Sequence, residues 1–222
     1  MRTTEDIAAS ALKEGIRAHQ KEDLVTAEKL YRRVLANSKQ PSYEIFLNYG
    51  ALLRKLNKPE EASAVYKRGI SQHPKQVLLL RNYGNLQIQE GHFAKALSLF
   101  LKAEQHSIET NKLDKLDAIY RQQAEALTEL GQIRLALKLL EPILIKLDKK
   151  DTSLQLGMAD LYIETNNFSK ARELALPIID QNDPTLGEAY QWSNLLLKLG
   201  EFDKALDKFE NATNTHRRRA AE

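Results

Sequence analysis

Small and bulky apolar residues recur along the chain with a period of about 34 residues, which is typical of a repeat protein. The Asn-Tyr-Gly tripeptide of residues 48–50 returns at residues 82–84, and the same register extends over six units. The units begin at Ala8, Tyr43, Val77, Asp117, Thr152 and Leu186. Residues within a unit are numbered below from position 1 at its start.

Two positions of the unit carry a small residue in every copy. Position 20 is always alanine (Ala27, Ala62, Ala96, Ala136, Ala171, Ala205), and position 8 is small (Gly15, Gly50, Gly84, Ala124, Ala159, Ser193). Position 24 is bulky in five units (Tyr31, Tyr66, Phe100, Leu140, Phe209) and is Ala175 in the other. This pattern predicts two helices per unit that approach closely at the small residues, with the bulky side chain beside the contact.

Position 15 indicates a turn in the middle of each unit. Its residues are Glu22, Asn57, Gly91, Gly131, Asn166 and Gly200, and glycine and asparagine tolerate the left-handed conformation that ends a helix. Each unit is therefore predicted to contain a first helix of about 14 residues, a tight turn and a second helix of similar length. Pro74 and Pro184 fall where a second helix should stop.

Two irregularities interrupt this register. Residues 104–117 hold the extra length between units three and four, which predicts either a lengthened helix or loop, or a bend between the units. Pro142 and Pro177 both occupy position 26, inside predicted second helices. Because proline has no backbone N–H to donate, we expect each to kink its helix and to change the local curvature.

Small residues at positions 8 and 20, an aromatic residue at 24 and proline near the end of the unit are similar to the tetratricopeptide repeat family. The family's usual tryptophan at position 4 is absent from all six units. The resemblance implies an all-α fold, a right-handed α-α superhelix or solenoid of about twelve antiparallel helices. It covers residues 8–216, between an N-terminal lead-in (residues 1–7) and a short basic tail (residues 217–222).

Composition narrows the class of protein further. Leucine and alanine are abundant, valine is scarce and cysteine is absent, which favours helices and excludes disulfides and thiolate metal sites. No apolar run is long enough to span a membrane, and acidic residues near the N-terminus disfavour a signal peptide, so we expect a cytoplasmic protein. We find no phosphate loop, nucleotide fingerprint or metalloprotease motif. The sequence therefore predicts a protein that is not an enzyme and has no cofactor or metal.

One face of the first helices offers a candidate binding surface. Positions 2, 5, 6, 9, 12 and 13 lie opposite the packed side, and we call their surface the first-helix face. In the family this face lines a concave groove for peptides. Position 6 carries the carboxamides Asn48, Asn82, Gln122 and Gln191, which resemble the asparagine ladder of O-linked N-acetylglucosamine transferase at Asn48 and Asn82 only. Amides pair with any peptide backbone, although the alternative of an ordinary solvated polar face stays open.

Charge on this face changes sign along the chain. The net charge is +3 overall, +5 over residues 1–111 and −2 over residues 112–222. The candidate groove residues are Arg54, Lys55, Arg81 and Arg121, then Glu125 and Asp160, with Asn85 and Asn194 beside them. This polarity favours an extended ligand whose acidic segment lies toward the N-terminal half. A solvated face without ligand is the open alternative.

These observations predict a non-catalytic scaffold that binds an extended peptide or protein partner in the groove. The alternatives are a recruiting arm of a larger glycosyl-, sulfo- or methyltransferase, or a homo-oligomer formed through an end repeat. The clamp by which some family members hold chaperone tails is matched only by Asn48, so that ligand is disfavoured. Three arginines near the C-terminus are too few to predict nucleic-acid binding, and no small-molecule substrate is indicated.

Overall fold

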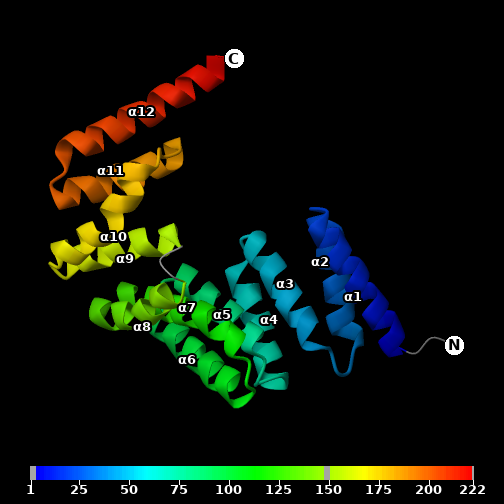
Figure 1. The fold of residues 1–222 in the computed structure, drawn as a ribbon. Coiled ribbons are helices and arrows are strands. Elements are labelled where there is room, and N and C mark those ends of the chain that lie inside the picture. The colour runs from blue at the N-terminus through cyan, green and yellow to red at the C-terminus, as the bar shows by residue number, and fades with distance from the viewer. Residues whose placement is uncertain (1–3, 148–150, 222) are drawn as a thin grey trace. The chain divides into compact units, whose positions relative to one another are not determined.

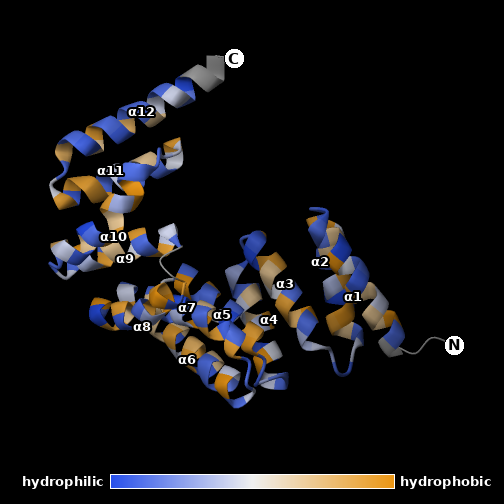
Figure 2. Ribbon diagram, in the orientation of Figure 1, coloured by the Kyte–Doolittle hydropathy of each residue, from blue (hydrophilic) through white to orange (hydrophobic). Residues whose placement is uncertain are grey.

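The computed structural model describes residues 4–147 and 151–221. Within these ranges the chain forms twelve α-helices, one short 3-10 helix and no β-strand (Figure 1). Hydrophobic and hydrophilic residues are interspersed along the helices (Figure 2), as expected for amphipathic helices. The predicted all-α fold is therefore confirmed. The chain divides into two compact units, Met1–Leu130 (unit 1) and Gly131–Glu222 (unit 2).

Unit 1 consists of three packed helix pairs and one further first helix. The helices are α1 (Thr4–Gln20), α2 (Leu24–Asn37), α3 (Tyr43–Lys55), α4 (Pro59–Gln72), α5 (Val77–Gln89), α6 (Phe93–Glu109) and α7 (Leu116–Glu129). The three pairs are α1 with α2, α3 with α4 and α5 with α6, each a first helix packed against the second helix of its own repeat. The first helices α1, α3, α5 and α7 also contact one another in succession.

Unit 2 repeats this arrangement. Its helices are α8 (Ile133–Lys146), α9 (Thr152–Glu164), α10 (Phe168–Gln181), α11 (Leu186–Leu199) and α12 (Phe202–Ala221). The pairs are α9 with α10 and α11 with α12, and the first helices α9 and α11 lie in contact. Four first helices (α3, α5, α9 and α11) begin at the residues from which their repeats were counted in the sequence.

The small residues of the repeat permit the close helix contact that their spacing predicts. Alanine at position 20 is fully buried in five repeats, and Ala205 is 3% exposed. At position 8, a Cβ added to Gly15 would lie 2.7 Å from a ring carbon of Tyr31, and Gly50 and Gly84 stand in the same relation to Tyr66 and Phe100. The bulky residue at position 24 therefore packs directly on the backbone at position 8.

A left-handed residue ends the first helix of all six repeats. Glycine and asparagine adopt it as expected, and Glu22 also adopts it with a φ of 63° although it is neither. In the added segment between the third and fourth repeats, α6 continues to Glu109, Asn111 is left-handed with a φ of 53°, and a 3-10 helix follows at Leu113–Lys115. The extra residues thus form a longer helix and a loop.

Pro142 and Pro177 lie inside α8 and α10, as their position in the repeat predicts, and the kinks expected there remain predictions. Two helices extend beyond the repeat bounds expected from the sequence. Helix α1 begins at Thr4, within the segment that was expected to be a lead-in, and residues 1–3 of that segment lie outside the described residues. Helix α12 is 20 residues long and includes residues 217–221 of the expected basic tail. Glu222 lies outside the described residues.

Candidate functional site

The first-helix face of unit 1 is a row of helices rather than a single cavity. Because α1, α3, α5 and α7 contact one another in succession, equivalent positions of neighbouring repeats lie beside each other. Several polar side chains on this face bond across from one first helix to the next. The arrangement of these bonds decides which groups can still interact with a ligand.

Two arginines on the face are held by neutral amides of the following first helix. Arg54 Nε on α3 donates a hydrogen bond to Gln89 Oε1 on α5 at 3.0 Å. Arg81 Nε on α5 donates to Gln122 Oε1 on α7 at 2.6 Å. In each case an arginine bonds a glutamine one position further on in the next repeat. Neither guanidinium has a carboxylate partner among the described residues, so both positive charges are uncompensated at short range.

The Arg81 bond belongs to a small network that brings three of the predicted site residues together. Gln122 Nε2 donates onward to Asn85 Oδ1 at 2.5 Å, so the Gln122 amide bridges α7 back to α5. Partial burial lowers the pKa of Arg81, but a guanidinium keeps its charge in proteins. Arg81 is therefore a fixed, half-buried positive charge on the first-helix face.

The four position-6 carboxamides have different environments. Asn48 Nδ2 donates to the backbone carbonyl oxygen of Glu44 on its own helix at 2.8 Å. Gln122 is engaged with Arg81 and Asn85, whereas Asn82 is half-buried on α5. Gln191 belongs to unit 2. The ladder that the sequence suggests thus remains a prediction, and Gln122 differs from the others because it already binds two neighbours.

Two of the predicted charged residues are neutralised by pairs within the chain. Lys55 Nζ lies 2.5 Å from Glu22 Oε2, which joins α3 to the turn after α1. Asp160 Oδ1 in unit 2 lies 2.6 Å from Lys198 Nζ. Such exposed pairs contribute little to stability, but they reduce the charge available to a ligand.

Two further predicted residues lie on α7. Arg121 also has an interaction partner within the chain. Partial burial, and then the carboxylate of Glu129 one turn away, raise the pKa of Glu125. The acidic end of the face in unit 1 is therefore formed by Glu125 and Glu129, on the same helix as Arg121.

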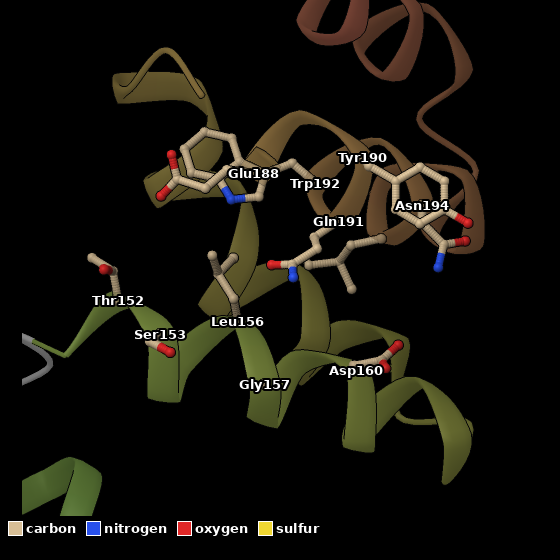
Figure 3. Close-up of a pocket in the computed structure, with 11 residues that line it drawn as sticks. Thr152, Ser153, Leu156, Gly157, Asp160, Glu188, Tyr190, Gln191, Trp192 and Asn194 are labelled. Atoms are coloured by element: carbon tan, nitrogen blue, oxygen red, sulfur yellow. The ribbon is translucent and has the colours of Figure 1, made fainter. Parts of the chain in front are cut away.

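In unit 2, the first-helix face opens into a hollow between α9 and α11, with a volume of about 410 Å³ (Figure 3). It is lined by Thr152, Ser153, Leu156, Gly157 and Asp160 of α9 and by Glu188, Tyr190, Gln191, Trp192, Asn194 and Leu195 of α11. Figure 3 shows Leu156 and Gln191 projecting from opposite helices into the space between them. We call this cavity the α9–α11 hollow.

The hollow contains three predicted site residues and several that the sequence did not single out. Asp160, Gln191 and Asn194 were predicted; Leu156, Gly157, Tyr190 and Trp192 were not. A signal for two of them was present, because Leu156 and Tyr190 both occupy position 5 of the first-helix face. Gly157 was visible only as the residue that interrupts the carboxamides at position 6.

Other kinds of site were also sought. Within residues 4–147 and 151–221, no group of three or more histidine, aspartate or glutamate side chains is placed to hold a metal ion. In the same described part of the chain, no helix combines the length and the apolar character needed to cross a membrane.

Comparisons with known proteins agree with this architecture. Two tetratricopeptide repeat family models match residues 47–108 and 127–192, which together make up more than half of the chain. No curated protein matches the sequence.

Three solved structures illustrate the similarity of fold. PilF of Pseudomonas aeruginosa superimposes with a TM-score of 0.72 at 16% identity, covering 93% of this chain and 90% of its own. YrrB, a tetratricopeptide repeat protein, has a TM-score of 0.61 at 17% identity over 83% of this chain and 91% of its own. The TPR2B domain of yeast Sti1 has a TM-score of 0.52 at 24% identity over 55% of this chain and 97% of its own. The family models and the shared fold lead to one conclusion: this chain belongs to the tetratricopeptide repeat family.

Proposed function

We propose that the chain is a non-catalytic scaffold whose first-helix face binds an extended peptide, or an extended segment of a protein partner. The tetratricopeptide repeat fold supports a role in protein interaction in general, because stacked repeats present a long continuous surface. Among the similar structures, YrrB is described as having an unusual peptide-binding site, and the Sti1 domain was solved as a complex with pHsp70. These descriptions favour a peptide ligand over other classes.

The observation that carries the proposal is the pair of arginines held by amides. A guanidinium has five N–H donors, and the Nε of Arg54 and of Arg81 is bound by glutamine oxygen rather than by a carboxylate. Each glutamine orients the guanidinium without neutralising it. A carboxylate of a ligand can then accept hydrogen bonds from the remaining N–H groups. We therefore assign the acidic segment of the ligand to the face formed by α3, α5 and α7.

The amides of the same face supply contacts that do not depend on the ligand's sequence. Asn48 uses one of its N–H groups on its own helix, and Asn82 lies one repeat further along at the equivalent position. An amide oxygen and N–H group can pair with the backbone of an extended peptide. In this scheme the arginines select acidic side chains, and Asn48 and Asn82 hold the backbone.

A direct test uses two labelled nonapeptides that differ only in charge. One carries four glutamates in a Gly-Ser background, and the other carries glutamines at the same positions. Fluorescence anisotropy at low salt should show tighter binding of the glutamate peptide to the full chain. The Arg54→Gln/Arg81→Gln variant should bind it about tenfold more weakly, because it lacks two charge-assisted contacts. Added salt should reduce the difference between the two peptides.

Two other double variants complete this experiment. Lys29→Gln/Arg33→Gln removes the same charge from exposed positions of α2 and should leave binding close to that of the native chain. Asn48→Ala/Asn82→Ala should weaken both peptides while leaving the thermal unfolding curve unchanged. Equal binding of the glutamate and glutamine peptides would contradict the proposal, and so would equal losses in the Arg54→Gln/Arg81→Gln and Lys29→Gln/Arg33→Gln variants.

A second candidate function is association through the last helix. On α12, Phe202, Leu206 and Phe209 are 66%, 60% and 44% exposed, and their spacing places them on one side of the helix. This apolar stripe favours homo-oligomerisation through the end repeat. Light scattering during gel filtration would give a mass that rises with concentration, whereas a constant monomer mass would exclude this candidate. The recruiting-arm alternative is a prediction that no described residue tests.

A further inference from the structure

At position 6 of the first-helix face, Gly157 leaves open space where the other repeats carry a side chain. It lies inside α9, where glycine is less favourable than alanine by about 0.5–1 kcal/mol. Nothing in the packing requires a glycine there, because an added Cβ would meet no atom within 4 Å. Gly157 differs in this respect from Gly15, Gly50 and Gly84, which a neighbouring aromatic ring contacts. What the missing side chain provides is room in the α9–α11 hollow.

The walls of the hollow combine apolar side chains with polar ones. Leu156 projects from α9 and Trp192 and Leu195 contribute from α11. At the rim, the ring of Tyr190 is 71% exposed and lies beside this space. These groups surround a volume of about 410 Å³, within the range typical of ligand sites. An apolar side chain of a ligand would bury both itself and the exposed ring of Tyr190.

Two carboxylates lie at the hollow, and within the described part of the chain only one of them has a cationic partner. The carboxylate of Asp160 pairs with Lys198 at 2.6 Å. Glu188 instead accepts hydrogen bonds from the Thr185 backbone N–H at 2.9 Å and from the Thr185 hydroxyl at 2.7 Å. Both of these donors are neutral, and Glu188 has no cationic partner among the described residues. A carboxylate has room for further hydrogen bonds, so a basic group of the ligand would complement Glu188.

We infer that the α9–α11 hollow is a specificity pocket for a large apolar side chain of an extended peptide, adjacent to a lysine or arginine that pairs with Glu188. This inference rests on the proposed function, since it assumes that the ligand is an extended peptide. It assigns to unit 2 a preference different from the acidic one of unit 1. Gly157 provides the space, Tyr190 and Trp192 provide the apolar contact, and Gln191 and Asn194 are placed beside the peptide backbone.

The test selects ligands from a displayed library of random nonapeptides with the full native chain. Enriched peptides that contain a large apolar residue next to lysine or arginine are then synthesised and titrated. Trp192 is the only tryptophan of the chain and lines the hollow, so its fluorescence reports directly on occupancy. We expect these peptides to change the Trp192 emission on binding.

Three variants locate the site. Gly157→Leu fills the hollow and should weaken the selected peptides at least about tenfold, as expected when one large apolar side chain can no longer be buried. Glu188→Gln should weaken peptides with a basic residue but not those in which it is replaced by glutamine. Ser169→Leu introduces the same side chain at an exposed position of α10, outside the residues that line the hollow, and this variant should bind as the native chain does.

The outcomes separate this inference from the proposed function. Selected peptides that bind Gly157→Leu as tightly as the native chain, or leave the Trp192 emission unchanged at saturation, overturn the pocket while leaving peptide binding intact. Enriched peptides that lack the apolar-basic pair also overturn it. Failure of the native chain to enrich any peptide, together with equal binding of the two charge-matched peptides described above, overturns both.

Discussion

At the scale of single residues, the glycines at positions 8 and 6 of the first helices serve two different purposes. At position 8, Gly15, Gly50 and Gly84 let an aromatic ring of the second helix lie directly on the backbone of the first. At position 6, Gly157 has no such neighbour and opens the first-helix face instead. The same amino acid thus supports packing in one place and leaves space in the other. Because the two roles differ in what surrounds the α-carbon, the same substitution should have opposite effects.

We predict that Gly84→Ala destabilises the protein and that Gly157→Ala stabilises it. The Cβ of alanine at position 84 would overlap the ring of Phe100, and overpacking of this kind costs about 1–3 kcal/mol. At position 157 the methyl group meets nothing, so the gain in helix propensity of about 0.5–1 kcal/mol remains. Urea denaturation followed by circular dichroism gives the two free energies of unfolding. Changes of the same sign would show that the surroundings of the two glycines are not as described.

At the scale of elements, the repeat register predicts the backbone better than the partners of the side chains. The spacing of glycine and asparagine locates the turns, since few residues tolerate a positive φ. Glu22 shows the limit: the register places a left-handed residue there although its type does not favour one. In the added segment, where there is no repeat to follow, neither the left-handed Asn111 nor the 3-10 helix could be predicted.

The candidate site was predictable to a smaller extent. The sequence places Arg54, Arg81 and Gln122 on one face, but which of them bond depends on how far each first helix is offset from the next. The structure shows that offset, because position 12 meets position 13 of the next repeat and position 5 meets position 6. The hollow at Gly157 was missed for another reason. The cavity depends on how closely α9 approaches α11 around Gly157, and the residue pattern alone does not give that distance.

Helix α11 supplies most of the walls of the hollow, and a capping box fixes its beginning. The Thr185 hydroxyl caps the Glu188 backbone N–H, and the Glu188 carboxylate accepts from the Thr185 backbone N–H. Hydrogen bonds from Thr185 lower the pKa of Glu188. We predict that Thr185→Ala reduces the free energy of unfolding by about 1 kcal/mol at neutral pH, whereas Thr185→Ser, which keeps the hydroxyl, has a much smaller effect.

The effect of Thr185→Ala should also depend on pH. Because the pKa of Glu188 is lower in the folded chain, its stabilising contribution is present above the ordinary glutamate pKa of 4.5 and is lost as the pH falls through the folded value. The difference between Thr185→Ala and the native chain should therefore be largest near neutral pH and shrink in acid. Urea titrations at several pH values measure it. A difference that stays constant or grows in acid would exclude this role of the capping box.

At the scale of the whole molecule, the two units carry surfaces of different chemistry. Unit 1 offers uncompensated guanidinium groups at Arg54 and Arg81, whereas unit 2 offers an apolar hollow beside the carboxylate of Glu188. We expect a peptide that contains both an acidic segment and an apolar-basic segment to bind both surfaces. Occupation of one surface then raises the effective concentration of the second segment at the other, without any new contact.

We predict that a bipartite peptide binds more tightly than either of its segments alone. It joins the glutamate-containing segment to a selected apolar-basic segment through Gly-Ser linkers of several lengths, so that no separation of the surfaces has to be assumed. Affinity should pass through a maximum as the linker lengthens, because a short linker cannot span the sites and a long one dilutes the second segment. Gly157→Leu should reduce the bipartite peptide to the affinity of the acidic segment, and Arg54→Gln/Arg81→Gln should reduce it to that of the other segment. If no linker gives a gain, or if either variant leaves the gain intact, the two surfaces do not bind one ligand together.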